Sequence, residues 1–208
     1  MKKLVLIIIA LFATPSAVSA QTLSTTDAAV WITDSEFNDP SITDEEGTVQ
    51  FEFDEDAGYG ISLNHFWVSS FSTELAYHKF GADTEVSVDD GPRFDAGEVD
   101  ASALTGIAQW HFRRASRFSP YVGAGVAYMS GEFDPVDFDG ENEAAIDFED
   151  ELTWAANFGA NINLTDRFAI GLDAKYIPWE PRGEGDEAPS DRVDLSPLVL
   201  SAGLRVRF

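Results

Sequence analysis

The sequence predicts an all-β fold: an eight-stranded antiparallel transmembrane β-barrel with long extracellular loops and short periplasmic turns. Three observations lead to this prediction. Residues 198–208 alternate strictly between apolar and mostly polar positions, the N-terminus has the features of an export signal, and long acidic connections alternate with short ones. Successive side chains of a strand point to opposite faces, so the alternation indicates a strand with one apolar face.

The N-terminal segment has the pattern of a secretory signal peptide. Met1-Lys2-Lys3 is a cationic start, Leu4–Ala13 is an almost unbroken apolar run, and Val18-Ser19-Ala20 supplies small residues for cleavage. The apolar run is too short for a membrane-spanning helix, which needs roughly 20 residues. We therefore expect a cleaved signal peptide over residues 1–20 and an outer-membrane β-barrel domain over residues 21–208.

Acidic residues dominate the composition. The chain has 37 Asp and Glu residues against 13 Lys and Arg residues, for a formal net charge of −24. Such a chain repels nucleic-acid phosphates, so we expect no nucleic-acid partner. An aromatic content of 12% is too high for a disordered acidic protein. The sequence has no cysteine, which excludes disulfides and thiol chemistry.

The acidic residues are concentrated in four blocks that also contain turn-forming residues. These blocks hold 33 of the 37 acidic residues and only three basic ones, and we predict that they are long loops. In an up-and-down antiparallel barrel alternate connections share one rim, and outer-membrane barrels have their long loops outside and their short turns in the periplasm. The blocks cover residues 34–56, 82–100, 132–151 and 180–194, and the short connections cover residues 67–70, 113–118 and 164–167.

Eight segments have the alternation expected of membrane strands, and their lengths suit tilted strands, which need roughly 9–11 residues. The first segment is the poorest, because Asp27 and paired alanines blur its pattern. The sixth is clean, with Trp154 and Phe158 on one face and Asn157 on the other. The predicted strands cover Leu23–Thr33, Ala57–Phe66, Phe71–Gly81, Val99–Phe112, Pro120–Phe133, Leu152–Leu164, Arg167–Trp179 and Leu198–Phe208.

A soluble β-sandwich is the alternative fold, since it also has one apolar face, which is turned inward. The signal peptide and the loop pattern favour the membrane barrel in the bacterial outer membrane. The C-terminal residues Gly203, Val206 and Phe208 resemble the signal by which the barrel-assembly machinery recognises outer-membrane barrels. Aromatic residues near strand ends suit either interfacial girdles or a core; they are Trp67, Trp110, Phe112, Trp154 and Tyr176.

Several motifs resemble the outer membrane protein W (OmpW) family and cover the second to eighth predicted strands. They are Gly106–Phe112, Ser119–Tyr128, Ile177 after Tyr176, and Asp194–Pro197 followed by Ser201–Gly203. The resemblance implies an eight-stranded outer-membrane barrel with a narrow, partly hydrophobic channel for small hydrophobic molecules, with a lateral exit into the bilayer. The chain departs from the family pattern at Lys175 and Leu198, where the family has Trp.

The predicted inward faces carry mixed polar residues. Eight strands leave an interior that side chains can fill or that holds one small ligand. Buried charges must be paired, so these residues fit a structural plug. They also fit a constriction that selects small permeants. The candidate lumen residues are Glu74, His78, Asn157, Asn161, Asp173, Lys175, Arg205 and Arg207.

We therefore expect a narrow channel for small hydrophobic molecules or ions, without cofactor or catalytic residues. The alternatives are a non-conducting structural or adhesion barrel and, less favoured, a lipid A-modifying enzyme. His65, His78 and His111 are the histidines available for catalysis, and no Ser/Asp motif accompanies them. The segment Asp134–Glu143 lacks calcium-loop spacing because residue 135 is Pro, so we expect a solvated acidic loop first and a weak divalent-cation site second.

Overall fold

The structure is a computed structural model, and all its regular elements are β-strands within the residues that it describes. These residues are 25–37, 41–43, 48–55, 57–88, 91–112, 116–136, 145–182 and 194–208. The predicted signal peptide lies outside them. No helix in this described part is long and apolar enough to cross a membrane.

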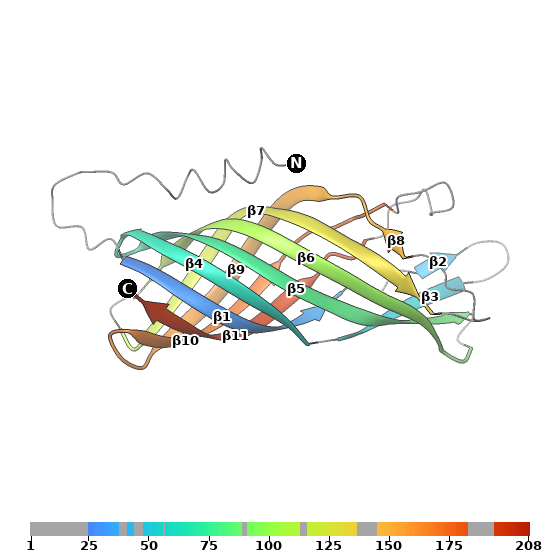
Figure 1. Cartoon of the computed structure of the whole chain (residues 1–208), viewed down its shortest axis with the longest axis horizontal. Coiled ribbons are helices and arrows are strands. Elements are labelled where there is room, and N and C mark those ends of the chain that lie inside the picture. The colour runs from blue at the N-terminus through green and yellow to red at the C-terminus, as the bar shows by residue number, and fades with distance from the viewer. Residues whose placement is uncertain are drawn as a thin grey trace.

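Eight strands form a closed ring in which every pair of neighbours is antiparallel (Figure 1). They are β1 (Thr25–Glu36), β4 (Ala57–Val68), β5 (Phe71–Val88), β6 (Phe94–His111), β7 (Phe118–Pro135), β9 (Glu151–Asn163), β10 (Phe168–Tyr176) and β11 (Leu198–Arg207). The ring follows this order, and β11 pairs with β1 to close it. The predicted number and order of barrel strands are confirmed.

Three short strands extend the wall at the end opposite the C-terminus (Figure 1). They are β2 (Ser41–Thr43), β3 (Thr48–Glu55) and β8 (Ile146–Asp147). β3 pairs with the part of β5 that lies beyond β4, and β8 pairs with the part of β7 that lies beyond β9. We call this the long-connection end and the opposite one the short-turn end.

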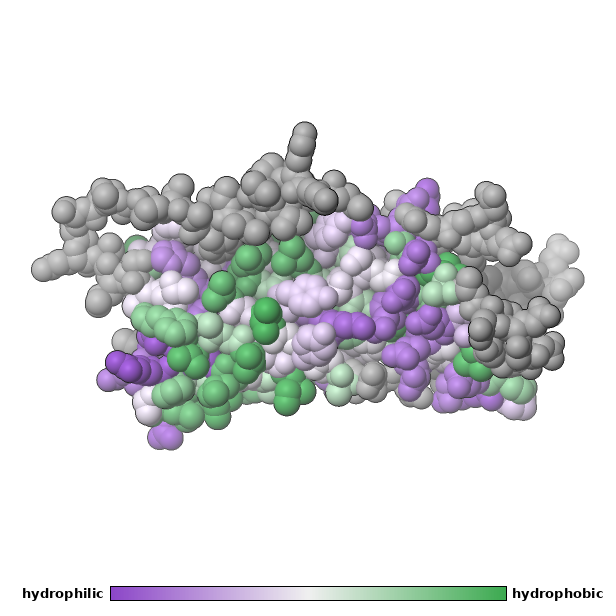
Figure 2. All heavy atoms as spheres, viewed as in Figure 1, coloured by the Kyte–Doolittle hydropathy of each residue, from purple (hydrophilic) through white to green (hydrophobic). Residues whose placement is uncertain are grey.

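The outer wall carries the apolar side chains, as the alternation predicted. On β4, for example, Tyr59, Ile61 and Leu63 are exposed. Ser62 and Asn64, which alternate with them along the strand, are buried inside the ring. Figure 2 shows hydrophobic atoms gathered over the short-turn half of the visible face and hydrophilic atoms over the long-connection half. The aromatic residues near strand ends, including Trp110 and Trp154, are exposed, so they belong to the outer wall and not to a core.

The second acidic block is a strand extension, and the prediction of a long loop over residues 82–100 is wrong. β5 continues to Val88 and β6 begins at Phe94, with pairing from Gly81↔Asp100 up to Val86↔Phe94. Acidic side chains there alternate with buried ones such as Ala82 and Val99, so the strand pattern continues. Acidic residues on the outer face of the extension hid that pattern in the sequence.

β10 ends at Tyr176, three residues before the predicted end of this strand at Trp179. Proline has no backbone N–H, so Pro178 cannot donate to a ladder. The chain instead turns inward, and Ile177 donates its N–H to the Pro197 carbonyl at 3.2 Å. This inward turn buries Ile177 and Trp179 completely.

Candidate functional site: the barrel interior

The interior contains nearly all the candidate lumen residues. Arg207 is the exception, because its side chain is partly exposed at the short-turn end. The buried ones are Glu74, His78, Asn157, Asn161, Asp173, Lys175 and Arg205. They come from β5, β9, β10 and β11, which the ring places around one lumen. The inward faces of these strands therefore supply a shared polar site.

Glu74 is the centre of the buried charges. Its Oε1 lies 3.6 Å from Lys175 Nζ and its Oε2 lies 3.4 Å from Arg205 Nη2. All three side chains are 2–3% exposed. Lys175 also contacts His78 Nε2 at 3.2 Å and Thr105 Oγ1 at 3.4 Å. Pairing offsets the several kcal/mol per ion that burial of these charges costs.

Asp27 is a further member of this network, and the sequence analysis missed it. Its carboxylate lies 4.0 Å from Arg205 Nη1 and accepts a hydrogen bond from Arg207 Nε at 3.3 Å. The side chain is almost fully buried, in phase with Trp31 and Thr33 on the inner face of β1. The acid that blurred the first predicted strand is therefore an inward-facing partner of two arginines.

Asp173 is held by hydrogen bonds. Its Oδ2 accepts from Tyr121 Oη at 2.7 Å and from Asn157 Nδ2 at 2.8 Å. We call the buried ion pairs and the hydrogen-bonded Asp173 together the ion-pair layer. It consists of Asp27, Glu74, Asp173, Lys175 and Arg205. The layer links β1, β5, β10 and β11 across the lumen.

Trp31 fills the lumen beside the ion-pair layer. Its indole lies over two glycines of neighbouring strands: a Cβ at Gly171 would come within 2.5 Å of Trp31 Cη2, and one at Gly203 within 2.7 Å of Trp31 Cε3. The indole N–H donates to Ser62 Oγ at 3.0 Å, and the Arg205 guanidinium lies 5.6 Å from the ring centroid. Gly203 thus has a packing role, while an assembly signal formed with Val206 and Phe208 stays a prediction.

The long-connection half of the interior contains a large apolar cluster, together with a few buried hydroxyl groups such as those of Ser35 and Thr84. We call its inward-facing cluster the apolar cap; it includes Phe37, Phe80, Met129, Ile177, Trp179 and Leu195. Trp179 lies against Gly131, where a Cβ would come within 2.8 Å of its Cη2, and contacts the Phe148 ring edge-on at 5.6 Å between centroids. Its backbone N–H donates to Ser196 Oγ at 3.2 Å, and its carbonyl accepts from Leu195 N at 2.9 Å.

His111 and His65 both contact hydroxyl groups of neighbouring strands. His111 Nε2 lies 2.9 Å from Ser72 Oγ inside the barrel, and its ring packs 5.1 Å from that of Tyr121. His65 contacts Thr26 Oγ1 at 3.1 Å.

One group of carboxylates has the spacing of metal ligands. Oxygen atoms of Asp100, Glu132 and Asp134 lie within 4.8 Å of one another on the outer wall near the long-connection end. Carboxylate oxygens are suitable ligands for Ca²⁺. The predicted acidic segment Asp134–Glu143 lies largely outside the described residues, so its cation binding stays a prediction.

The OmpW family profile matches residues 25–208. Outer membrane protein W of Vibrio cholerae serotype O1 is 29% identical over 149 residues, which cover 68% of this chain and 69% of that protein. Outer membrane protein AlkL of Ectopseudomonas oleovorans is 29% identical over 116 residues, or 53% of this chain. That match spans only 48% of AlkL, about half of its length.

Solved structures of outer-membrane barrels have the same fold. OprG from Pseudomonas aeruginosa has a TM-score of 0.72 at 17% identity, covering 90% of this chain and 97% of OprG. AlkL in lipid bilayers has a TM-score of 0.62 at 18% identity, covering 94% of this chain and 95% of AlkL. These similarities confirm the predicted fold class and, with the family match, the location in the bacterial outer membrane.

Proposed function

Because the chain belongs to the OmpW family of outer-membrane barrels, we propose that it gives small hydrophobic molecules a route into the outer membrane. The observation that carries this proposal is the division of the lumen. Its long-connection half is lined by the apolar cap, and its short-turn half is crossed by the ion-pair layer. An apolar solute would enter from outside and leave through the wall.

The apolar cap is suited to an uncharged solute. Trp179 lies fully buried in it, and its backbone is held at both ends: its N–H donates to Ser196 Oγ and its carbonyl accepts from Leu195 N. Its indole nitrogen is buried without a hydrogen-bond partner among the described residues. The side chain therefore loses little hydrogen bonding when a solute displaces it.

The ion-pair layer acts as the barrier to the periplasm. Passage beyond it would separate Glu74 from Lys175 and Arg205 inside a medium of low dielectric constant. An uncompensated buried charge costs several kcal/mol, and an apolar solute offers no replacement partner. We therefore assign the candidate lumen residues the role of a plug at this level, with selection of permeants at the apolar cap.

We assign the lateral exit to a gap in strand pairing at the polar edge of the apolar band, where the outward-facing residues are Asp34 and Ala57. β1 pairs with β4 only as far as Asp34↔Ala57, and beyond this point no ladder joins β1 to β3 within the described residues. Phe37 fills this gap, with its ring 5.7 Å from that of Phe53 and 6.0 Å from that of Phe80. Side-chain packing separates more readily than a hydrogen-bonded ladder, because no backbone group loses its partner.

Uptake measurements test this function. The purified protein is reconstituted into vesicles, and entry of an apolar fluorescent solute is followed together with ion conductance. We expect solute entry without ion steps, because the ion-pair layer blocks the direct path. A structural or adhesion barrel would give neither signal, and an open aqueous pore would give ion steps.

Two tryptophan variants locate the route. Trp179→Ala opens the apolar cap and should increase solute entry several-fold. Trp110→Ala removes an indole that is 52% exposed on the outer wall and should leave entry unchanged. Equal entry in the two variants would argue against passage through the apolar cap.

A further inference from the structure

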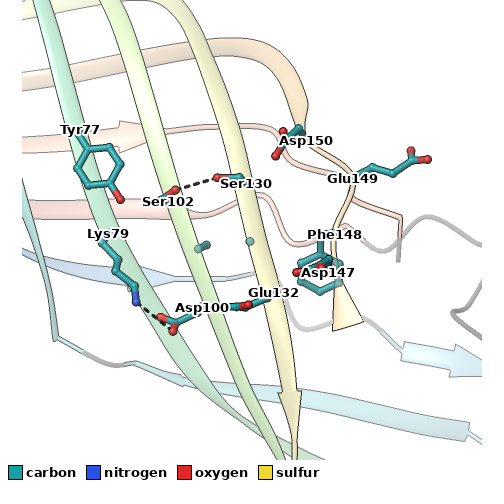
Figure 3. A pocket seen from close by; sticks show the side chains of 12 residues that line it. Tyr77, Lys79, Asp100, Ser102, Ser130, Glu132, Asp147, Phe148, Glu149 and Asp150 are labelled. Carbon is teal, nitrogen blue, oxygen red and sulfur yellow. Dashed lines mark hydrogen bonds and ion pairs between the residues drawn. The ribbon is translucent and has the colours of Figure 1, made fainter. Parts of the chain in front are cut away.

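The outer wall contains a pocket that the proposed transport route does not use. It has a volume of about 810 Å³, and its polar lining side chains project outward from three adjacent strands, β5, β6 and β7 (Figure 3). The segment Asp147–Asp150, which leads into β9, forms one side of it (Figure 3). The pocket therefore opens toward the surroundings of the barrel and not toward the lumen.

The strand register places this pocket at the boundary of the apolar band. One cross-strand row consists of Tyr77, Leu104 and Tyr128. The next row toward the long-connection end consists of Lys79, Ser102 and Ser130. All three strands thus change from apolar to polar side chains at the same row. Aromatic residues in membrane barrels mark the interface, so the pocket lies at the level of the outer-leaflet headgroups.

The pocket combines hydrogen-bonding groups of several kinds around an aromatic edge. Lys79 Nζ is paired with Asp100 Oδ2 at 3.1 Å, and the hydroxyls of Ser102 and Ser130 lie 2.9 Å apart. The carboxylates of Glu132 and Asp147 line the same pocket, and neither takes part in an ion pair within the part of the chain that the structure describes. They are acceptors that a ligand with hydroxyl donors would satisfy.

We propose that this pocket binds the saccharide headgroup of an outer-leaflet glycolipid. Sugar hydroxyls donate to the Glu132 and Asp147 carboxylates, and charge-assisted hydrogen bonds of this type are the stronger ones. The Tyr77 ring, at the apolar edge, packs against the sugar, while the acyl chains continue along the apolar row below. The volume is within the range of about 300–1,000 Å³ that ligand pockets have.

The lining disfavours other occupants of the same membrane level. An acyl chain alone would cover the carboxylates without offering them donors, at a cost of roughly 1–3 kcal/mol for each unsatisfied group. A phosphate-only headgroup meets five carboxylates and one ammonium in the pocket, so it is repelled. A neutral sugar has donors for the carboxylates and no charge that opposes them.

Lipid retention by the full protein in nanodiscs tests the proposal. Phosphatidylcholine nanodiscs are doped with either glucosyl diacylglycerol or diacylglycerol, and the lipid retained after exchange is measured by native mass spectrometry. We expect preferential retention of the glucosyl lipid. Glu132→Gln combined with Asp147→Asn should lower this retention about tenfold, which corresponds to about 1.4 kcal/mol.

A matched double variant separates hydrogen bonding from charge. Asp83→Asn combined with Asp166→Asn removes the same number of charges from exposed positions that do not line the pocket, and it should retain the glycolipid normally. Equal loss in both double variants would overturn the proposal in favour of a general charge effect. Equal retention of the two lipids, or binding that a chelator abolishes, would overturn it in favour of acyl packing or cation bridging.

Folding and transport are monitored in the same samples. Heat-modifiable migration reports the folded barrel, so a variant that fails to fold is recognised before binding is measured. Solute entry should be unchanged in both double variants, because the pocket lies outside the lumen. Failure of the glycolipid to bind therefore leaves the proposed transport route unaffected, and the converse also holds.

Discussion

Glu74 determines whether the interior charges are compensated. Its two oxygens serve Lys175 and Arg205, which come from strands far away in the sequence, and all three groups are almost fully buried. An exposed pair such as Lys79–Asp100, at 42% and 28% side-chain exposure, has water as an alternative partner. The same pairing chemistry therefore has very different energetic consequences at the two positions.

Glu74→Gln should lower the free energy of unfolding by about 3 kcal/mol, because it leaves two buried cations with one carboxylate fewer. Asp100→Asn, which breaks the exposed pair, should cost less than about 1 kcal/mol. Urea unfolding of the refolded barrel in lipid vesicles measures both. Combining Glu74→Gln with Lys175→Met should recover part of the loss, and a simple sum of the two single effects would contradict the coupling.

Gly171→Ala should destabilise the barrel by about 1–3 kcal/mol, since its Cβ would overlap the Trp31 indole. Gly106→Ala is the matched control, because a Cβ there meets nothing within 4 Å. The same unfolding assay reports both changes. Trp31→Leu should relieve the overlap in the Gly171→Ala background, and persistence of the full penalty would show that the indole is not its cause.

At the scale of the strands, alternation predicted which face of β9, β10 and β11 turns inward. Most outward apolar positions there are followed by a polar residue or glycine, with Ala155, Ala169 and Val199 as exceptions, and a one-residue change of register would reverse both faces. The extensions of β5 and β6 were missed because their outer faces carry acids in place of apolar residues. The inward turn at Trp179 was missed because its partners Ser196 and Leu195 follow a long connection.

The pairing of interior charges could not be predicted in the same way. Asp27 and Arg207 are 180 residues apart, and the register of the closing ladder decides that they meet. Alternation reveals that a side chain faces inward but not which residue lies across the lumen. The set of inward-facing candidates was therefore predictable on the clean strands, whereas Glu74 as their common partner was visible only in the closed ring.

Leu172→Arg should destabilise the folded barrel by about 2–4 kcal/mol, because it places a charge on the apolar outer face of β10. Leu172 is 47% exposed, so the penalty comes from the lipid and not from core packing. Asp83→Arg, on the polar extension of β5, should change the free energy by less than about 1 kcal/mol. Unfolding in lipid vesicles compares them, and similar penalties would mean that the assigned apolar band is misplaced.

The whole molecule has a strong asymmetry of charge. Of its 37 acidic residues, 33 lie in the four sequence blocks, together with three basic ones, and the described acids of these blocks, such as Asp83 and Asp147, lie toward the long-connection end. Such a rim repels itself and attracts cations from solution. Salt shortens the range of this repulsion, from a Debye length of about 30 Å at 0.01 M to about 8 Å at 0.15 M.

Raising the salt concentration from 0.01 M to 0.15 M should therefore slow protease cleavage at the acidic rim of the folded barrel. The physical reason is that screened carboxylates repel one another less. Cleavage is followed by mass spectrometry across a salt series, with an unfolded substrate as the control for the protease itself. Cleavage rates that do not fall after this correction would contradict the electrostatic explanation.

The ladder between β1 and β11 makes the fold one of high contact order. It pairs residues from Asp27↔Arg207 to Glu36↔Leu198. The first and last strands of the ring each gain their second neighbour only when this ladder forms. Loop-closure entropy opposes such long-range pairing until it forms, which slows folding. We therefore expect ring closure to be a late step of folding, and the Asp27–Arg205 contact across this ladder to form with it.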